Sequence, residues 1–164
     1  MTNETAIPFH LETHQFGAST IQLQIPDDGY IQQKYKTEKL NDKATPFPYW
    51  ARLWPSSIAL CEFIAGNPVY IQNKNVLELA AGLGLPSLLS APFAANVIAS
   101  DYLPEAVGFI RQSAEINNFQ NIECRLINWN AIDESITADV LLLSDINYAP
   151  AAFEQLFKVV YSFI

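Results

Sequence analysis

The pattern of hydrophobic and polar residues divides this chain into an N-terminal part and a longer part that begins near residue 46. Ser19-Thr-Ile-Gln-Leu-Gln-Ile25 alternates apolar and polar residues, which predicts a half-buried strand between Phe16 and Ile25. A turn is expected at 26–29, residues 1–15 show no firm pattern, and the lysine-rich stretch 34–43 is expected to be a solvated loop or helix face. We therefore expect residues 1–45 to form an N-terminal extension with one strand.

From residue 46 onward, short apolar runs alternate with amphipathic segments. Strands are expected at 75–79, 96–100, 122–127 and 140–144, and helices at 55–66, from 84, at 104–117 and from 150 to the end. Val140-Leu-Leu-Leu143 is continuously apolar, as is typical of a parallel strand covered on both faces. Right-handed crossovers between such strands predict an α/β fold: a Rossmann-like, doubly wound, mostly parallel sheet with helices on both faces.

Composition narrows the class of protein. The 164 residues suffice for one ordinary domain, and the net charge of −8 argues against binding nucleic acid through its phosphates. No apolar run approaches the roughly 20 residues that span a bilayer, and the N-terminus lacks a secretory signal, so no membrane partner is expected. Cys61 and Cys124 have no metal-ligand spacing. We expect two reduced thiols in a cytoplasmic protein.

The stretch Val76-Leu-Glu-Leu-Ala-Ala-Gly-Leu-Gly-Leu-Pro-Ser-Leu88 is the strongest candidate for a binding site. It predicts a strand, an acidic residue, a glycine turn and a helix, an order that suits a nucleotide-like ligand. A dinucleotide-binding turn reads G-x-G-x-x-G, but here only Gly82 and Gly84 are present and Ser87 takes the third place. Glu78 would repel a pyrophosphate and suits a ligand with an ammonium group. A tight turn without a ligand is the alternative.

Asp101 follows the second expected strand of this region. An acidic residue there is placed to accept hydrogen bonds from the 2′- and 3′-hydroxyls of a ribose. The same residue could instead cap the next helix, because Asp is a favoured N-cap. Together with the turn, ribose binding is the better interpretation.

These residues resemble a known family. Glu78-Leu-Ala-Ala-Gly-Leu-Gly84 is similar to motif I, E/D-x-G-x-G-x-G, of the class I, seven-stranded S-adenosylmethionine-dependent methyltransferases, and Asp101 matches their ribose-binding acid. Leu53-Trp54, Asn128-Trp129 and Asp145-Ile-Asn-Tyr148 resemble the branch of small protein-lysine methyltransferases often labelled nicotinamide N-methyltransferase-like. The last of these matches the D-x-x-Y motif of that branch. The resemblance covers roughly residues 47–150.

The resemblance implies S-adenosyl-L-methionine as cofactor and assigns roles to individual residues. The residues that it assigns to the cofactor are Trp54, Glu78, Gly82, Gly84, Asp101, Asn128 and Trp129. Glu78 would hold the ammonium end, Asp101 the ribose, and Asn128 and Trp129 would border the adenine. Asp145 would orient the acceptor amine and Tyr148 would shape its channel. Core packing is the alternative for the two tryptophans, and a strand-end cap and a surface aromatic for Asp145 and Tyr148.

The chain departs from the family pattern in two respects. Ala80 stands where the first glycine of motif I is usual. The chain also ends at Ile164, where a complete member would continue with three more strands, so we expect residues 46–164 to be a methyltransferase domain that is incomplete at its C-terminus. The strand at 140–144 would then be an apolar edge that invites dimerisation or aggregation.

Several functions remain open on the sequence. Methyl transfer to a lysine of a basic protein is the leading hypothesis, and N-methylation of a small amine or heterocycle uses the same chemistry. A truncated, non-catalytic cofactor-binding module is a third. A dinucleotide oxidoreductase is disfavoured by the glycine spacing and by Glu78.

Overall fold

The computed structural model describes residues 6–133, 135–146 and 150–163, and it contains two sheets in this part of the chain. An antiparallel hairpin is formed by β1 (Phe9–Phe16) and β2 (Ser19–Pro26). The central sheet is formed by β3 (Asn75–Leu79), β4 (Asn96–Asp101), β5 (Ile122–Leu126) and β6 (Val140–Leu143). Its order is β5-β4-β3-β6 and every neighbouring pair is parallel, which confirms the predicted α/β class.

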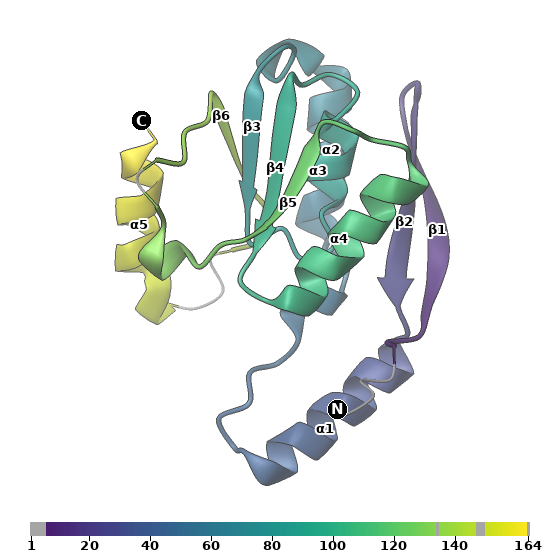
Figure 1. Cartoon of the computed structure of the whole chain (residues 1–164), viewed down its shortest axis with the longest axis vertical. Helices are drawn as coiled ribbons and strands as arrows, with labels where there is room; N and C mark the ends of the chain where they lie inside the picture. The colour runs from purple at the N-terminus through teal and green to yellow at the C-terminus, as the bar shows by residue number, and fades with distance from the viewer. Residues whose placement is uncertain (1–5, 134, 147–149, 164) are drawn as a thin grey trace.

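Helices cover both faces of this sheet. They are α1 (Asp28–Asn41), α2 (Pro55–Gly66), α3 (Leu85–Ser90), α4 (Pro104–Ile116) and α5 (Phe153–Ser162), with short 3-10 turns η1 (Tyr49–Ala51), η2 (Pro68–Tyr70), η3 (Trp129–Ala131) and η4 (Pro150–Ala152). Figure 1 shows α5 on one side of the sheet and α2, α3 and α4 on the other, with the hairpin outside α4 and α1 projecting below.

The alternation of residues along β3 explains these layers. Val76 packs in the large core beneath α2, α3 and α4. Glu78 points to the same side, as its hydrogen bond from the Ser87 N–H at the start of α3 shows. Leu77 and Leu79 face the opposite side and pack with Val159 of α5. One strand thus supplies apolar side chains to both faces, as its nearly continuous apolar sequence predicts.

Two N-terminal elements differ from the sequence prediction. Residues 9–16 form a strand, although the apolar Phe9 and Leu11 are about half exposed and mark no buried face. Residues 28–41 form a helix, α1, where a turn at 26–29 and a solvated loop or helix face at 34–43 were expected. The Asp27 side chain caps this helix by accepting from the Tyr30 N–H at 2.7 Å. Ile31 is its buried residue, so the helix has almost no hydrophobic period.

The hairpin is fastened to α4 by polar contacts as well as by apolar packing. The Gln22 N–H donates to Asn117 Oδ1 at 2.9 Å, and Asn117 Nδ2 donates back to the Gln22 carbonyl at 2.7 Å. The Gln24 N–H donates to Ser113 Oγ at 3.0 Å. Leu23 is fully buried in the core shared with α2, α3 and α4. The hairpin therefore covers the outer side of the helical layer.

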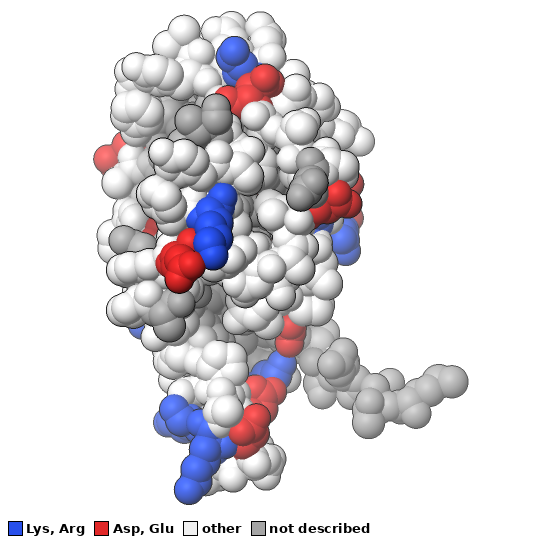
Figure 2. All heavy atoms as spheres, turned by 90° about the vertical axis from the view of Figure 1, so that its left-hand side faces the viewer, with Lys and Arg blue, Asp and Glu red and all other residues white. Residues whose placement is uncertain are grey.

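The outer side of α5 is apolar and exposed. Phe153, Phe157 and Tyr161 recur every four residues, with 46%, 65% and 65% of their surfaces exposed. Figure 2 looks onto this side, which carries few charged side chains, whereas both signs of charge gather at the α1 end below. Beside α5, β6 is an edge strand of the sheet as described. Within the described residues, none of the helices combines the length and the apolar character needed to cross a bilayer.

Candidate functional site

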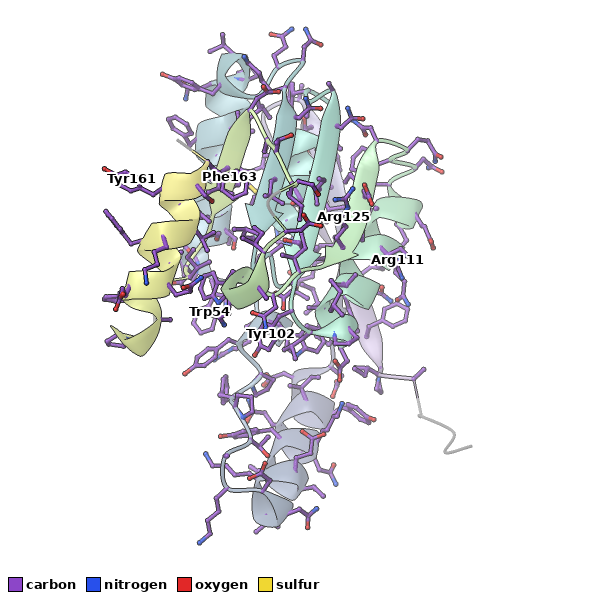
Figure 3. The ribbon with its side chains drawn as sticks, turned by 60° about the vertical axis from the view of Figure 1, so that its left-hand side comes forward. Trp54, Tyr102, Arg111, Arg125, Tyr161 and Phe163 are labelled. Carbon is purple, nitrogen blue, oxygen red and sulfur yellow. The ribbon has the colours of Figure 1, made fainter. Side chains whose placement is uncertain are left out.

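A pocket lies where the carboxyl ends of β3, β4 and β6 meet. Its floor comes from residues 80–85 after β3, 101–103 after β4 and 144–146 after β6, and residues 47–57 cover it. β4 and β5 extend the sheet on one side of β3 and β6 lies on the other, so the order in which strands are added reverses between β3 and β6. Parallel α/β sheets bind ligands at such a reversal. Figure 3 shows Trp54 and Tyr102 together at this end of the molecule.

The turn after β3 has an unusual backbone that explains its glycines. Gly82 and Gly84 have φ angles of 57° and 72°, in the left-handed region that favours glycine. A Cβ at Gly82 would lie 3.2 Å from the Trp50 carbonyl oxygen, and one at Gly84 would lie 2.9 Å from Ile110 Cγ1. Gly84 lines the pocket, and its lack of a side chain lets Ile110 of α4 pack closely against the turn. Ala80 adopts φ 51° without being glycine, so the turn carries backbone strain there.

Asp101 connects two of the loops that form the pocket. Its Oδ2 accepts from the Gly82 N–H at 3.0 Å and its Oδ1 accepts from the Leu103 N–H at 3.1 Å. Only 3% of the residue is exposed, and this burial raises the pKa of its carboxyl. A carboxylate offers about four acceptor positions, so Asp101 keeps capacity for further donors such as hydroxyls.

Glu78 lies behind the turn and does not line the pocket. It is fully buried, and its Oε2 accepts from the Ser87 N–H at 2.9 Å and from Ser87 Oγ at 2.5 Å. Burial raises the pKa of Glu78 to about 8. Among the described residues, no group donates to its buried Oε1. The predicted contact with an ammonium group stays a prediction.

The aromatic segment before α2 forms one wall of the pocket. Trp54 Nε1 donates to the Tyr49 carbonyl at 3.0 Å, and the Arg52 guanidinium lies 5.7 Å from the centroid of the Trp54 ring. All three residues line the pocket. Trp54 is also the residue before Pro55, the first residue of α2. Trp54 therefore lies at the pocket, and its predicted contact with the cofactor stays a prediction.

Asp145 follows β6, lines the pocket and is exposed to solvent. Its φ of 54° is unusual for a residue other than glycine, and such conformations are concentrated at functional sites. Beside it, Ser144 Oγ lies 2.7 Å from Ser57 Oγ of α2, which joins the end of β6 to the covering segment. Tyr148, the other predicted catalytic residue, lies outside the described residues.

Asn128 and Trp129 are not among the residues that line the pocket. Trp129 packs in the cluster around Leu77 and Leu79 on the α5 side of the sheet. The Asn128 side chain accepts from the Asn130 N–H at 2.9 Å and starts the η3 turn. The observed position of Trp129 corresponds to the core-packing alternative, and its contact with an adenine, like that of Asn128, stays a prediction.

Several pocket residues were not identified from the sequence, among them Ser57, Tyr102 and Ser144. Tyr102 directly follows Asp101, and about half of its surface is exposed. Its place next to Asp101, the residue that the sequence predicts for ribose binding, is the signal that could have identified it. Ser57 and Ser144 are 87 positions apart in the chain, so only the fold could show that they meet.

The parallel sheet, the glycine turn and the acid at the end of β4 define a nucleotide-binding α/β domain with the arrangement of class I methyltransferases. Comparison with known families identifies the family to which the chain belongs. A family model described as lysine methyltransferase matches residues 38–164, and the chain belongs to this family.

Curated relatives carry names of protein methyltransferases. The chain is 32% identical over 119 residues to the mouse histone-arginine methyltransferase METTL23. This alignment covers 69% of this chain and 47% of the mouse protein. It is 29% identical over 113 residues to the protein N-lysine methyltransferase METTL21A of Xenopus tropicalis, covering 66% and 52%. The chain thus spans about half the length of the curated relatives that it matches.

Solved structures share the fold at low sequence identity. The 16S rRNA methyltransferase RsmC of T. thermophilus superposes with a TM-score of 0.60 at 14% identity, covering 85% of this chain and 33% of that one. Protein arginine methyltransferase 10 of Arabidopsis thaliana superposes with a TM-score of 0.57 at 19% identity, covering 65% and 32%. Both likenesses concern the architecture of the domain.

Proposed function

We propose that this protein is an S-adenosylmethionine-dependent methyltransferase that methylates a lysine of a basic protein. One observation carries the proposal: three separate loops bring Gly82, Asp101 and Asp145 to one pocket at the carboxyl ends of β3, β4 and β6. Membership of the lysine methyltransferase family and the names of the relatives support it. RsmC of T. thermophilus, which shares the fold, was solved in complex with AdoMet and guanosine.

The residues present fit this cofactor. Asp101 has acceptor positions for ribose hydroxyls, and a side chain at Gly82 would crowd the Trp50 backbone at the edge of the site. The buried Oε1 of Glu78 lacks a donor among the described residues, and a water molecule that accepts from the cofactor's ammonium group would donate to it. When bound, the cofactor supplies an activated methyl group on a sulfonium.

The chemistry asked of the protein itself is mainly alignment. A methyl transfer is an in-line displacement, so orientation of the acceptor contributes more than acid–base catalysis. A lysine amine must lose its proton first, against an ordinary pKa of about 10.4. The exposed Asp145 carboxylate at the pocket can accept a hydrogen bond from this amine and orient it. We assign Tyr148 to the same channel on the family motif alone.

Arginine is the second candidate acceptor, because METTL23 of mouse is named a histone-arginine methyltransferase. A small amine acceptor and a non-catalytic cofactor-binding role for the 164-residue chain are further alternatives. Mass spectrometry of a methylated basic peptide distinguishes lysine from arginine directly. The net charge of −8 supports a basic protein as the partner over nucleic acid. The two free cysteines support a reducing compartment such as the cytoplasm.

Calorimetric titration with S-adenosylhomocysteine tests the proposal. We expect saturable binding with one site per chain, and addition of S-adenosylmethionine should give a comparable curve. Absence of binding by both compounds to a folded chain would overturn the assignment of the pocket. Binding without methyl transfer to any basic protein would favour the non-catalytic alternative.

A further inference from the structure

A second pocket lies next to the first, between α1 and the aromatic segment that precedes α2. Phe47, Trp50 and Leu103 line both pockets, so a single layer of side chains separates them. The outer walls of the second pocket carry Glu38 from α1 and Glu105 from the first turn of α4. We call this second pocket the α1 groove. It opens beside the site at which we place the methyl donor.

The α1 groove already holds one ammonium group of the protein itself. Lys34 Nζ lies 3.3 Å from Glu105 Oε1 and 3.9 Å from Glu38 Oε1, between two elements that are distant in sequence. The Tyr35 ring lies on the same wall and packs edge-on against Phe47, with 5.3 Å between the ring centroids. Two carboxylates thus hold the Lys34 head group, and the neighbouring Tyr35 ring already attracts a second cation, with Lys39 Nζ 5.0 Å from its centroid. Carboxylates and aromatic rings both attract cations.

The contacts of Lys34 are weak enough to be exchanged. Between 37% and 49% of the side chains of Lys34, Glu38 and Glu105 is exposed, and ion pairs at such sites contribute at most about 1 kcal/mol. A cation from another molecule can therefore replace Lys34 at these carboxylates at little cost, while Lys34 moves into solvent. Two carboxylates against one lysine leave the groove with a net negative charge once Lys34 has moved.

We propose that the α1 groove binds a basic residue of the protein substrate, close in sequence to the residue that is methylated, and that Lys34 occupies this position when no substrate is bound. The inference rests on the proposed function, which supplies the basic substrate. Charge complementarity and the shared wall of the two pockets support a protein segment that spans both. Glu38 and Glu105 are then specificity-determining residues, and Lys34 competes with the substrate.

The test measures binding of a fluorescein-labelled peptide of alternating Lys and Gly to the full chain by fluorescence anisotropy. Lys34→Met removes the competing ammonium and Lys36→Met, on the same helix, changes the net charge equally. Glu105→Gln removes one carboxylate, and Glu115→Gln makes the same change at the far end of α4. Thermal melting curves show that each variant is folded, and S-adenosylhomocysteine binding is measured in parallel.

We expect Lys34→Met to bind the peptide about threefold more tightly than Lys36→Met, and Glu105→Gln to bind it about threefold more weakly than Glu115→Gln, the scale of one exposed ion pair. Weaker or unchanged binding by Lys34→Met relative to Lys36→Met would overturn the proposal, because a purely structural Lys34 predicts that result. Equal binding by Glu105→Gln and Glu115→Gln would also overturn it. Failure of the donor site would appear separately, as loss of S-adenosylhomocysteine binding in the unmodified chain.

Discussion

Asp101 accepts hydrogen bonds from the loops that follow β3 and β4, at Gly82 and Leu103. The carboxylate therefore holds the pocket in shape and also presents its remaining acceptor positions to a ligand. Both tasks favour an ionised group, although burial raises its pKa. The two N–H donors offset part of the cost of burying this charge.

We expect Asp101→Ala to weaken S-adenosylhomocysteine binding by at least about 1 kcal/mol, roughly fivefold in Kd, because hydrogen bonds to a charged group are lost. Calorimetry measures the effect. Asp101→Asn keeps one acceptor oxygen, so its affinity should lie between those of the unmodified chain and Asp101→Ala. Asp133→Ala, at an exposed position, is the control. An Asp101→Ala chain that is folded and binds with unchanged affinity would contradict the ribose assignment.

Asp145 lines the pocket but is exposed, so its substitution should spare the fold. We expect Asp145→Asn to bind S-adenosylhomocysteine normally and to lose at least about tenfold in the rate of methyl transfer, since the amine is no longer held by a carboxylate. Transfer of a labelled methyl group to a basic protein measures the rate. Asp133→Asn serves as the matched control, and full activity in Asp145→Asn would remove this residue from the mechanism.

Glu78 is expected to make stability depend on pH. Its pKa is about 8 in the folded chain against an ordinary value of 4.5, so the folded state binds more protons than the unfolded state between these values. The free energy of unfolding should therefore fall as pH rises through this range, by on the order of 2 kcal/mol between pH 6 and pH 8.

Urea unfolding of Glu78→Gln checks this prediction. Gln is neutral at every pH and can still accept from Ser87, so the variant should lack the fall in stability seen in the unmodified chain. Glu62→Gln, at an exposed position on α2, should keep it. Parallel pH profiles for the unmodified chain and Glu78→Gln would show that Glu78 is ionised throughout.

At the scale of elements, the hairpin β1–β2 depends on contacts with α4. Asn117 bonds to both the N–H and the carbonyl of Gln22, which completes the hydrogen bonding of a strand whose outer neighbour is a helix. Its Nδ2 also donates to the Ser113 carbonyl near the end of α4. A single side chain thus joins a strand to a helix end.

We expect Asn117→Ala to lower the free energy of unfolding by about 0.5–1.5 kcal/mol, because the backbone of Gln22 and the Ser113 carbonyl lose a hydrogen-bond partner. Gln112→Ala, at an exposed position of α4, should change it by less than about 0.5 kcal/mol. Urea denaturation compares the two variants. Equal stability of both would mean that apolar packing alone holds the hairpin.

The elements that the sequence predicts best are those with strong periodic patterns. The spans expected for β3 to β6, α2 and α4 match the structure within about two residues. β1 was not predicted, and α1 was left open between a loop and a helix face, because burial gives both elements little pattern. Phe9 and Leu11 face solvent, and Ile31 is the buried residue of α1. Both elements are held mainly by their neighbours and by a polar cap.

At the scale of the whole molecule, β6 is an edge strand among the described residues, and the aromatic residues of α5 are exposed beside it. Figure 3 shows Tyr161 pointing outward from α5. An open strand edge next to exposed aromatic side chains favours association of chains. We expect the 164-residue chain to self-associate as concentration rises, and we assign this surface to the contact.

Sedimentation velocity of Phe157→Lys tests this assignment. Phe157 is 65% exposed, so the charge should spare the fold and shift the chain towards the monomer by severalfold in dissociation constant. Val69→Lys changes an equally exposed apolar residue on η2 and should leave association unaltered. Identical sedimentation of the two variants would place the contact elsewhere.

The sequence by itself determined the sheet strands, the glycine turn and the acid at the end of β4, because apolar period and backbone requirements are local properties. Tertiary structure decided which side chains meet. It brought Asp145 and Ser57 to the turn and turned Glu78 towards Ser87, and it placed Trp129 in the opposite layer. The order of the strands, and its reversal beside β3, set these contacts. Both depend on residues far apart in the chain, so no single segment of the sequence predicts them.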